Sequence, residues 1–291
     1  MENKKLFFGL HGLLLPEADF DLGNGVVVRE TYAHIFAPFM VAFSPPEEPT
    51  KHHPGPWSSA SGGMSYDISA ELVVPIESEN DVEKAIQTAR VILFLLRLGV
   101  NPAITLPVFS NLAFASENAN EKHQALYPFE VQNRSFALSV EEEAASFGSL
   151  KWVQDHWQVT QELLEKSPKF ALAKEAIDQG QFIQNTTLTL VSLWGALEAL
   201  FSPSTSELRF RVSALIASFL EKPGPSRREL QKKLAKLYDK RSAAAHGRPK
   251  HDQQHLLETF NLLRNVLFKI IESGYVPNNE QLDIMLFGSE S

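Results

Sequence analysis

The sequence predicts an α+β fold, in which a mixed α/β N-terminal domain is followed by an all-α helical bundle. Before about residue 140, short β-branched or alternating segments are separated by turns rich in glycine and proline. After that point, long segments of helical periodicity are separated by short Pro, Gly and Ser breaks. The chain has 291 residues, 44% of them hydrophobic and 21% charged, which is enough for two domains with real cores. We expect the domains to be 1–145 and 146–291.

The N-terminal domain contains two clear strand patterns and one helix pattern. Residues 25–32 are β-branched and follow a Gly-Asn-Gly turn, and residues 66–76 alternate between apolar and polar side chains. Between them, residues 44–63 are rich in Pro, Ser, Gly and His and predict a long exposed loop. A helix is expected from Ser78 to Gly99, with the glycine as its C-terminal cap. Two shorter β-like segments complete the domain: 103–109 and 129–138.

The C-terminal half is predicted to be a bundle of five helices. One of them opens with Ser226 three residues before Glu229, a pattern typical of a capping box, and it ends at Gly247 with Pro249 just beyond. The expected helices cover 140–166, 168–201, 207–221, 226–247 and 252–273.

The chain contains no cysteine. Disulfides, thiolate zinc sites and a cysteine nucleophile are therefore excluded, and the composition is consistent with a reducing cytoplasm. No secretory signal is visible, since the short apolar stretch after Lys5 is soon interrupted. The longest strongly apolar run, residues 91–96, is much too short to span a bilayer. We expect a soluble, cytoplasmic protein with no membrane partner.

The net charge of −8 argues at first against a nucleic-acid partner, but the charge is unevenly distributed. Residues 206–274 hold 14 Lys plus Arg and 7 Asp plus Glu, a local balance of +7. The rest of the chain therefore carries −15. Because a phosphate backbone responds to the local field, this basic region remains a candidate for binding RNA.

Within the basic region, Arg241 and His246 form a candidate catalytic pair. A histidine titrates near neutral pH and can move the proton of a ribose 2′-OH or of the leaving 5′-oxygen. An arginine can hold the scissile phosphate by a bidentate fork as negative charge develops. The surrounding cations would attract the RNA backbone. They are Lys232, Lys233, Lys236, Lys240 and Arg248.

The spacing of this pair does not by itself define a site. Five positions correspond to about 140° around a regular helix, so Arg241 and His246 do not share a face. They converge only if the last turn before Gly247 is distorted, or if two copies of the segment meet across a dimer axis. The pattern also occurs by chance, and a histidine before a C-terminal glycine is often a helix cap.

Two other patterns each have a functional and a structural interpretation. His251, His255 and Glu258 have the spacing of a two-histidine, one-carboxylate metal face, but an ordinary polar surface is the simpler interpretation. We therefore expect no metal and no cofactor. The aromatic residues Phe147, Trp152 and Trp157 lie on an amphipathic segment, where packing in a core or interface is more common than stacking on bases.

Three segments together resemble the HEPN superfamily, specifically its Apea-like branch. They are Ser192–Phe201, Glu207–Leu220 and Lys236–Gly247, and the resemblance covers residues from Leu190 to about Phe287. It implies a HEPN-like helical bundle that dimerises and so brings two Arg-x4–6-His motifs into one cleft. Active members are metal-independent endoribonucleases, often in toxin–antitoxin or antiviral systems.

By this resemblance, Arg241 and His246 correspond to the motif residues. Ser242 occupies the position after the arginine, where many active members carry Asn, Asp or His. Glu198 lies in the first resembling segment and either orients Arg241 or another cation, or forms a buried structural ion pair.

The function implied is RNA cleavage by a homodimer, with an antitoxin or regulatory protein as a possible partner and an N-terminal domain that senses or targets. The alternative is a catalytically inactive HEPN protein that acts as a dimeric nucleotide- or partner-binding module.

Overall fold

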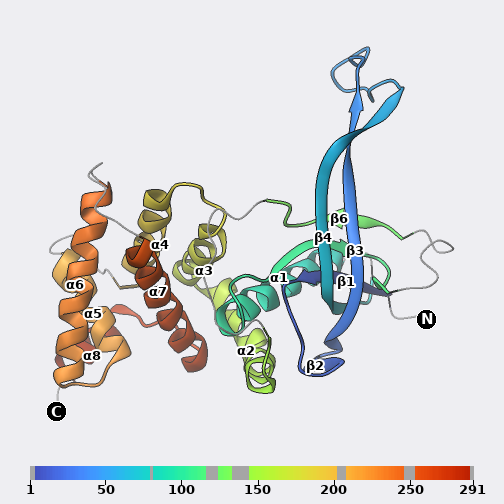
Figure 1. Cartoon of the computed structure of the whole chain (residues 1–291). Helices are drawn as coiled ribbons and strands as arrows, with labels where there is room; N and C mark the ends of the chain where they lie inside the picture. Colours follow the sequence, from blue (N-terminus) through green and yellow to red (C-terminus); the bar gives the residue numbers. More distant parts are fainter. Residues whose placement is uncertain are drawn as a thin grey trace. The chain divides into compact units, whose positions relative to one another are not determined.

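The computed structural model describes residues 4–78, 81–115, 124–132, 144–201, 208–245 and 253–288. The chain forms two compact units. The sheet unit comprises the described residues within 1–89, 104–131 and 142–147, and the helical unit those within 90–103, 132–141 and 148–291. An antiparallel sheet and a set of helices occupy separate parts of the chain, so the predicted α+β class is confirmed (Figure 1). The domain division expected after residue 145 stays a prediction.

The sheet unit is built on six strands in the order β2-β3-β4-β1-β5-β6, and every neighbouring pair is antiparallel. Its core is made by side chains that alternate toward one face, among them the fully buried Phe8, Leu10, Ile68 and Leu72. The strands are β1 (Lys4–His11), β2 (Asp19–Gly23), β3 (Val26–Ala42), β4 (Trp57–Ile76), β5 (Thr105–Ser110) and β6 (Leu126–Pro128).

The strand patterns found in the sequence are present, but both strands are longer than expected. The predicted turn joins β2 to β3, and its residues Gly23, Asn24 and Gly25 all have positive φ, which explains two glycines there. The segment predicted as a loop, 44–63, is wrong in its second part, because β4 already begins at Trp57. The sequence did not predict this part of the strand, because it is rich in serine and glycine and contains none of the β-branched residues that are enriched in strands.

The outer parts of β3 and β4 form a two-stranded ribbon, called the arm below (Figure 1). It comprises residues 33–42 and 57–68. β2 pairs with β3 only over residues 26–29, and β1 pairs with β4 only over 70–76. Beyond these positions the two strands pair with each other alone in the described part of the chain, and most side chains there are exposed.

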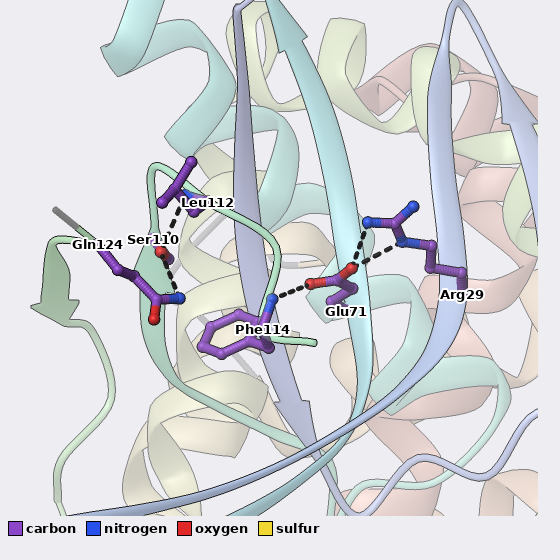
Figure 2. Close-up of polar contacts among 6 residues, drawn as sticks. All are labelled: Arg29, Glu71, Ser110, Leu112, Phe114 and Gln124. Carbon is purple, nitrogen blue, oxygen red and sulfur yellow. Dashed lines mark hydrogen bonds and ion pairs between the residues drawn. The ribbon is translucent and has the colours of Figure 1, made fainter. Parts of the chain in front are cut away.

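The buried carboxylate of Glu71 links the sheet to the segment that follows β5 and forms an ion pair with the partly exposed Arg29 (Figure 2). Glu71 on β4 is 1% exposed, and its Oε1 accepts from Nε of Arg29 at 2.7 Å. Its Oε2 accepts from the backbone N–H of Phe114 at 2.9 Å. The ring of Phe114 lies over Gly9, where a Cβ would be 2.9 Å from Cζ of the ring. We call this arrangement the Glu71 latch.

The helical unit holds the C-terminal part of α1 (Val82–Gly99) and the helices from α2 to α8. One predicted helix, 168–201, is wrong as a single element, because it is interrupted between α3 and α4. Asn185 accounts for the restart, since its side chain accepts from the N–H groups of Thr187 and Leu188. The helices are α2 (Phe147–Lys166), α3 (Pro168–Gly180), α4 (Thr186–Phe201), α5 (Leu208–Leu220), α6 (Pro225–Ala245), α7 (Gln253–Ser273) and α8 (Asn279–Phe287).

Several helix starts differ from the sequence prediction: α1 begins at Val82 rather than at Ser78, and α2 begins at Phe147, with residues 144–146 outside the helix. α6 begins at Pro225, so Ser226 lies inside the first turn, and the carboxylate of Glu229 pairs with Lys232 at 2.8 Å. The predicted capping box at Ser226 is therefore wrong. The capping box that does form starts α8, between Asn278 and Gln281, and that helix was not predicted.

The core of the helical unit lies around α4 and α7. α4 contributes Leu193, Trp194 and Leu197, and the buried face of α7 runs from His255 to Ile271. No helix in the described ranges combines the length and apolar character needed to cross a membrane.

Candidate active site on helix α6

Helix α6 presents one buried stripe and one strongly basic exposed face. Leu234, Leu237 and Tyr238 are buried at i, i+3 and i+4 spacing, as expected for a helix lying on a core. The lysines at 232, 233, 236 and 240 are exposed. Arg241 lies between the two faces with its side chain 21% exposed.

Arg241 is held by an acidic residue from another helix. Its Nη2 is 3.3 Å from Oε1 of Glu198 on α4, and both side chains are 21% exposed. The same Oε1 accepts a hydrogen bond from the hydroxyl of Tyr238 at 2.9 Å. The guanidinium carbon of Arg241 also lies 5.5 Å from the centre of the Tyr238 ring, within cation–π distance. Glu198, Tyr238 and Arg241 therefore form one cluster.

The ring of Tyr238 packs against the buried core of the helical unit. The ring of Trp194 on α4 meets it edge to face, with centroids 5.2 Å apart. Burial raises the pKa of Tyr238, and its hydrogen bond to Glu198 acts in the same direction. The phenol therefore stays protonated at neutral pH and remains a donor to the Glu198 carboxylate.

Within the cluster, not every N–H donor of the Arg241 guanidinium has a hydrogen-bond partner among the described residues. Nε of Arg241 is buried and has no hydrogen-bond partner among the described residues. A single contact of 3.3 Å is also longer than the 2.7–2.9 Å usual for charge-assisted hydrogen bonds. The buried Nε is not accessible to a ligand, but an arginine carries five N–H donors, so the remaining Nη donors of this partly exposed side chain can contact a phosphate while Glu198 orients it.

The basic face of α6 is partly balanced by carboxylates. Lys232 pairs with Glu229 at 2.8 Å on the same helix, and Lys233 pairs with Glu258 of α7 at 3.4 Å. The side chain of Gln254, with Lys233 and the field of Lys240, lowers the pKa of Glu258. Lys236 and Lys240 make no ion pair within 4.0 Å to a described acidic residue, so they contribute most to the exposed positive field.

The side chains of three predicted site residues are not described by the structure. His246 and Arg248 lie outside the described residues. Ser242 belongs to the helical backbone of α6, and its side chain is outside the description. The structure therefore brings Arg241 together with Glu198, while the pairing of Arg241 with His246 remains a prediction.

The metal-site alternative finds no support in its described members. His255 is fully buried, and Glu258 is paired with Lys233, while His251 lies outside the described residues. Within the described ranges, His, Asp and Glu side chains form no group of three that could hold a metal ion.

The aromatic residues of α2 mostly serve packing. Trp157 is buried, and the ring of Trp152 lies between His156 at 4.9 Å and Phe268 at 4.7 Å. Phe147 is exposed on its helix and meets Phe20 edge to face in the sheet unit.

Sequence reasoning missed the role of Tyr238. The signal was present, because Tyr238 precedes Arg241 by three positions and residues at i and i+3 are neighbours on a helix surface. What the sequence did not show is that Glu198 would reach both side chains from α4.

Comparison with known proteins gives no independent assignment: no protein-family model, no curated protein and no solved structure matches the chain.

Proposed function

We propose that this protein is a metal-independent HEPN endoribonuclease of the Apea-like kind, acting as a homodimer in a toxin or antiviral system. The observation that carries the proposal is the Glu198–Tyr238–Arg241 cluster at the end of a lysine-rich helix. A partly exposed arginine with one ion pair among the described residues, next to an exposed basic face, is suited to binding a phosphodiester. The identity of the reaction rests on the HEPN resemblance.

In the proposed reaction, Arg241 binds the scissile phosphate and His246 transfers protons. A base removes the proton of the ribose 2′-OH, and the 2′-oxygen forms a bond to phosphorus. The bond from phosphorus to the 5′-oxygen breaks, and the leaving oxygen takes up a proton. The products are a 2′,3′-cyclic phosphate and a 5′-OH. The charge that develops on the phosphoryl oxygens is stabilised by the guanidinium, which Glu198 and Tyr238 hold in place.

One observation favours a second function. Arg241 already has a carboxylate partner, and a Glu–Arg pair between two helices also serves as a structural contact. On that interpretation the chain is a catalytically inactive HEPN protein whose bundle dimerises and binds a nucleotide or a partner protein.

The two functions are separated by RNA cleavage measured in EDTA with the wild type, Arg241→Ala and His246→Ala. We expect at least about a hundredfold loss in each variant, since each removes a group acting in the transition state. Arg228→Ala is a matched control, because it removes an exposed arginine from the other end of α6. It is expected to change cleavage only about two- to threefold through the electrostatic field.

Equal cleavage by all four proteins would overturn the assignment of Arg241 and His246. An absence of cleavage with single-stranded, structured and transfer RNAs would favour the inactive alternative. Mass analysis of the product ends tests the proposed chemistry, since a 3′-OH product would exclude attack by the 2′-OH.

A further inference from the structure

One face of the arm carries a serine, a histidine and an aspartate that are linked by hydrogen bonds. Ser65 and Asp67 lie two positions apart on β4, and His34 on β3 is the register partner of Asp67. The three side chains therefore project from the same face of the ribbon. Oγ of Ser65 is 3.3 Å from Nε2 of His34, and Nδ1 of His34 is 2.8 Å from Oδ1 of Asp67. This order of groups is the one that activates a serine as a nucleophile.

The partners of His34 determine which of its ring nitrogens carries the proton. A carboxylate only accepts hydrogen bonds, so Nδ1 of His34 donates to Asp67. In the neutral ring Nε2 is then the acceptor, and the hydroxyl of Ser65 donates to it. His34 is therefore placed to remove the proton of Ser65, while Asp67 holds the ring in the required tautomer.

Asp67 is kept ionised by its neighbours. The hydrogen bond from His34 lowers the pKa of Asp67 most, and the field of His11 and a hydrogen bond from Tyr32 act in the same direction. Nδ1 of His11 also donates to the backbone carbonyl of Asp67 at 2.7 Å. The carboxylate is therefore charged at neutral pH, and it stabilises the imidazolium that forms when His34 takes up a proton.

The backbone of Ser65 supplies a donor for the oxygen of an attacked acyl group. The N–H and C=O groups of one strand residue point to the same edge, and this orientation repeats every second residue. The carbonyl of Asp67 points away from β3, because it accepts from His11 on β1. The N–H of Ser65 points the same way, since the pairing of residues 63–68 with β3 is continuous. Among the described residues β1 pairs with β4 only from Ala70 onward, so this N–H has no strand partner and can donate to an oxyanion.

The surface beside Ser65 is apolar and open. Phe36 is the register partner of Ser65 on β3 and is 60% exposed. Residues directly opposite each other have Cβ atoms about 4.5–5.5 Å apart, so an acyl or aryl group on Oγ of Ser65 reaches the ring of Phe36. His34 and Asp67 are half exposed or more, so water is not excluded. The site therefore suits small esters, and its rate enhancement is expected to be modest.

We propose that Ser65, His34 and Asp67 form a nucleophilic site that hydrolyses small carboxylic esters. Oγ of Ser65 attacks the carbonyl carbon as its proton moves to His34. The C–O bond of the ester then breaks, and the leaving alcohol or phenol takes the proton from His34. Water attacks the acyl-serine in the same way and releases the carboxylic acid and free Ser65. Ser65 and His34 contact the reacting atoms, and Asp67 is a positioning residue.

The arm contains its own control serines for a labelling experiment. Ser58, Ser59 and Ser61 are exposed on the same strand as Ser65, and in the described part of the chain none of them has a hydrogen bond to a histidine. The full chain is treated with phenylmethanesulfonyl fluoride, whose sulfur is attacked by an activated serine oxygen as fluoride leaves. No cysteine competes for the reagent. Mass spectrometry of the peptides is expected to show Ser65 labelled at least about tenfold faster than each control serine.

Hydrolysis of p-nitrophenyl acetate tests turnover in the wild type, Ser65→Ala, His34→Ala and the control Ser59→Ala. We expect kcat/KM to fall at least about tenfold in the first two variants and less than about twofold in the control, with unchanged circular dichroism spectra. Added imidazole is expected to restore sulfonyl labelling of Ser65 in His34→Ala, which a purely structural role of His34 would not produce. Equal labelling of the four serines, labelling of none of them, or unchanged hydrolysis by Ser65→Ala would overturn the proposal.

The ribonuclease proposal can fail without affecting these results, since the ester site lies in the sheet unit. Ser65→Ala is expected to leave RNA cleavage in EDTA unchanged, and Arg241→Ala is expected to leave the labelling of Ser65 unchanged.

Discussion

Each unit of the molecule contains a glutamate–arginine pair, and the two pairs differ in how completely their hydrogen bonds are used. In the sheet unit, both oxygens of Glu71 have partners, at 2.7 Å to Arg29 and 2.9 Å to Phe114. In the helical unit, Oε1 of Glu198 accepts from the hydroxyl of Tyr238 at 2.9 Å and also lies 3.3 Å from Nη2 of Arg241.

The burial of the two carboxylates differs in the same direction, since Glu71 is 1% exposed and Glu198 is 21% exposed. The arginines differ in the opposite direction, at 41% for Arg29 and 21% for Arg241. A buried carboxylate must have its partners or lose stability, while a partly exposed carboxylate can hydrate when its partner turns to a ligand. The comparison teaches that the Glu71 latch is a structural element and that the Glu198 cluster has capacity left for function.

The largest expected effect is on the Glu71 latch. Glu71→Ala leaves the N–H of Phe114 and one side of Arg29 without an acceptor, and we expect a loss of about 3 kcal/mol in the free energy of unfolding. Arg29 is 41% exposed and can partly hydrate, which keeps the loss below that of a fully buried pair. Urea denaturation measures it. A loss below about 1 kcal/mol would remove the contrast between the two pairs.

A smaller loss in the free energy of unfolding is expected when the latch is disturbed at the ring of Phe114. Gly9→Ala adds a Cβ only 2.9 Å from the Phe114 ring and 3.0 Å from Cδ1 of Ile68, so both must shift. Overpacking of this kind costs about 1–3 kcal/mol. If Gly9→Ala and Glu71→Ala act on one latch, the double variant loses less than the sum of the two single losses. Additive losses would show that they are independent.

In the helical unit, Tyr238→Phe removes the hydrogen bond to Glu198 and keeps the ring under Arg241. We expect a loss of about 1 kcal/mol. The raised pKa of Tyr238 adds a pH dependence: its contribution to stability is complete below the unfolded pKa of about 10 and is lost as the pH rises through the higher folded value. Thermal unfolding at about pH 9 and about pH 11 should therefore show a smaller decrease in the variant than in the wild type.

The smallest stability effect is expected for Glu198→Gln. The amide oxygen can still accept from Tyr238, and a pair with both members partly exposed contributes less than about 1 kcal/mol. If Glu198 orients Arg241 for catalysis, RNA cleavage should nevertheless fall about tenfold at unchanged melting temperature. Unchanged cleavage by an otherwise active enzyme would show that the pair is only structural.

The fold class could be predicted because periodicity is a local property. The Val-rich start of β3 and the apolar stripes of the helices were visible in the sequence. The outer half of β4 was not, because its Ser and Gly residues are held in a strand by pairing with β3, a contact distant in sequence. The break between α3 and α4 was hidden by continuous helical periodicity, and only the cap at Asn185 reveals it.

The candidate site shows the same limit. Arg241 could be selected from its residue type and its basic surroundings, and Glu198 from the resemblance. Tyr238 joins them only because α4 and α6 pack together. This packing places the Tyr238 hydroxyl 2.9 Å from Oε1 of Glu198, although the two residues are 40 positions apart in the sequence. No local pattern encodes such a distance.

The ion pairs along α6 determine how steeply the proposed RNA binding should respond to salt. Each phosphate neutralised by a cation releases counterions, with a slope of about −0.7 per contact on a logarithmic plot for single strands. Lys232 and Lys233 already have carboxylate partners, so counting every lysine of the helix would overstate the number of phosphates bound. Arg241 likewise has Glu198 as a partner. With only Lys236 and Lys240 contributing, the slope is about −1.4 from these residues, and on the proposed function the helix would release RNA gradually rather than abruptly as ionic strength rises.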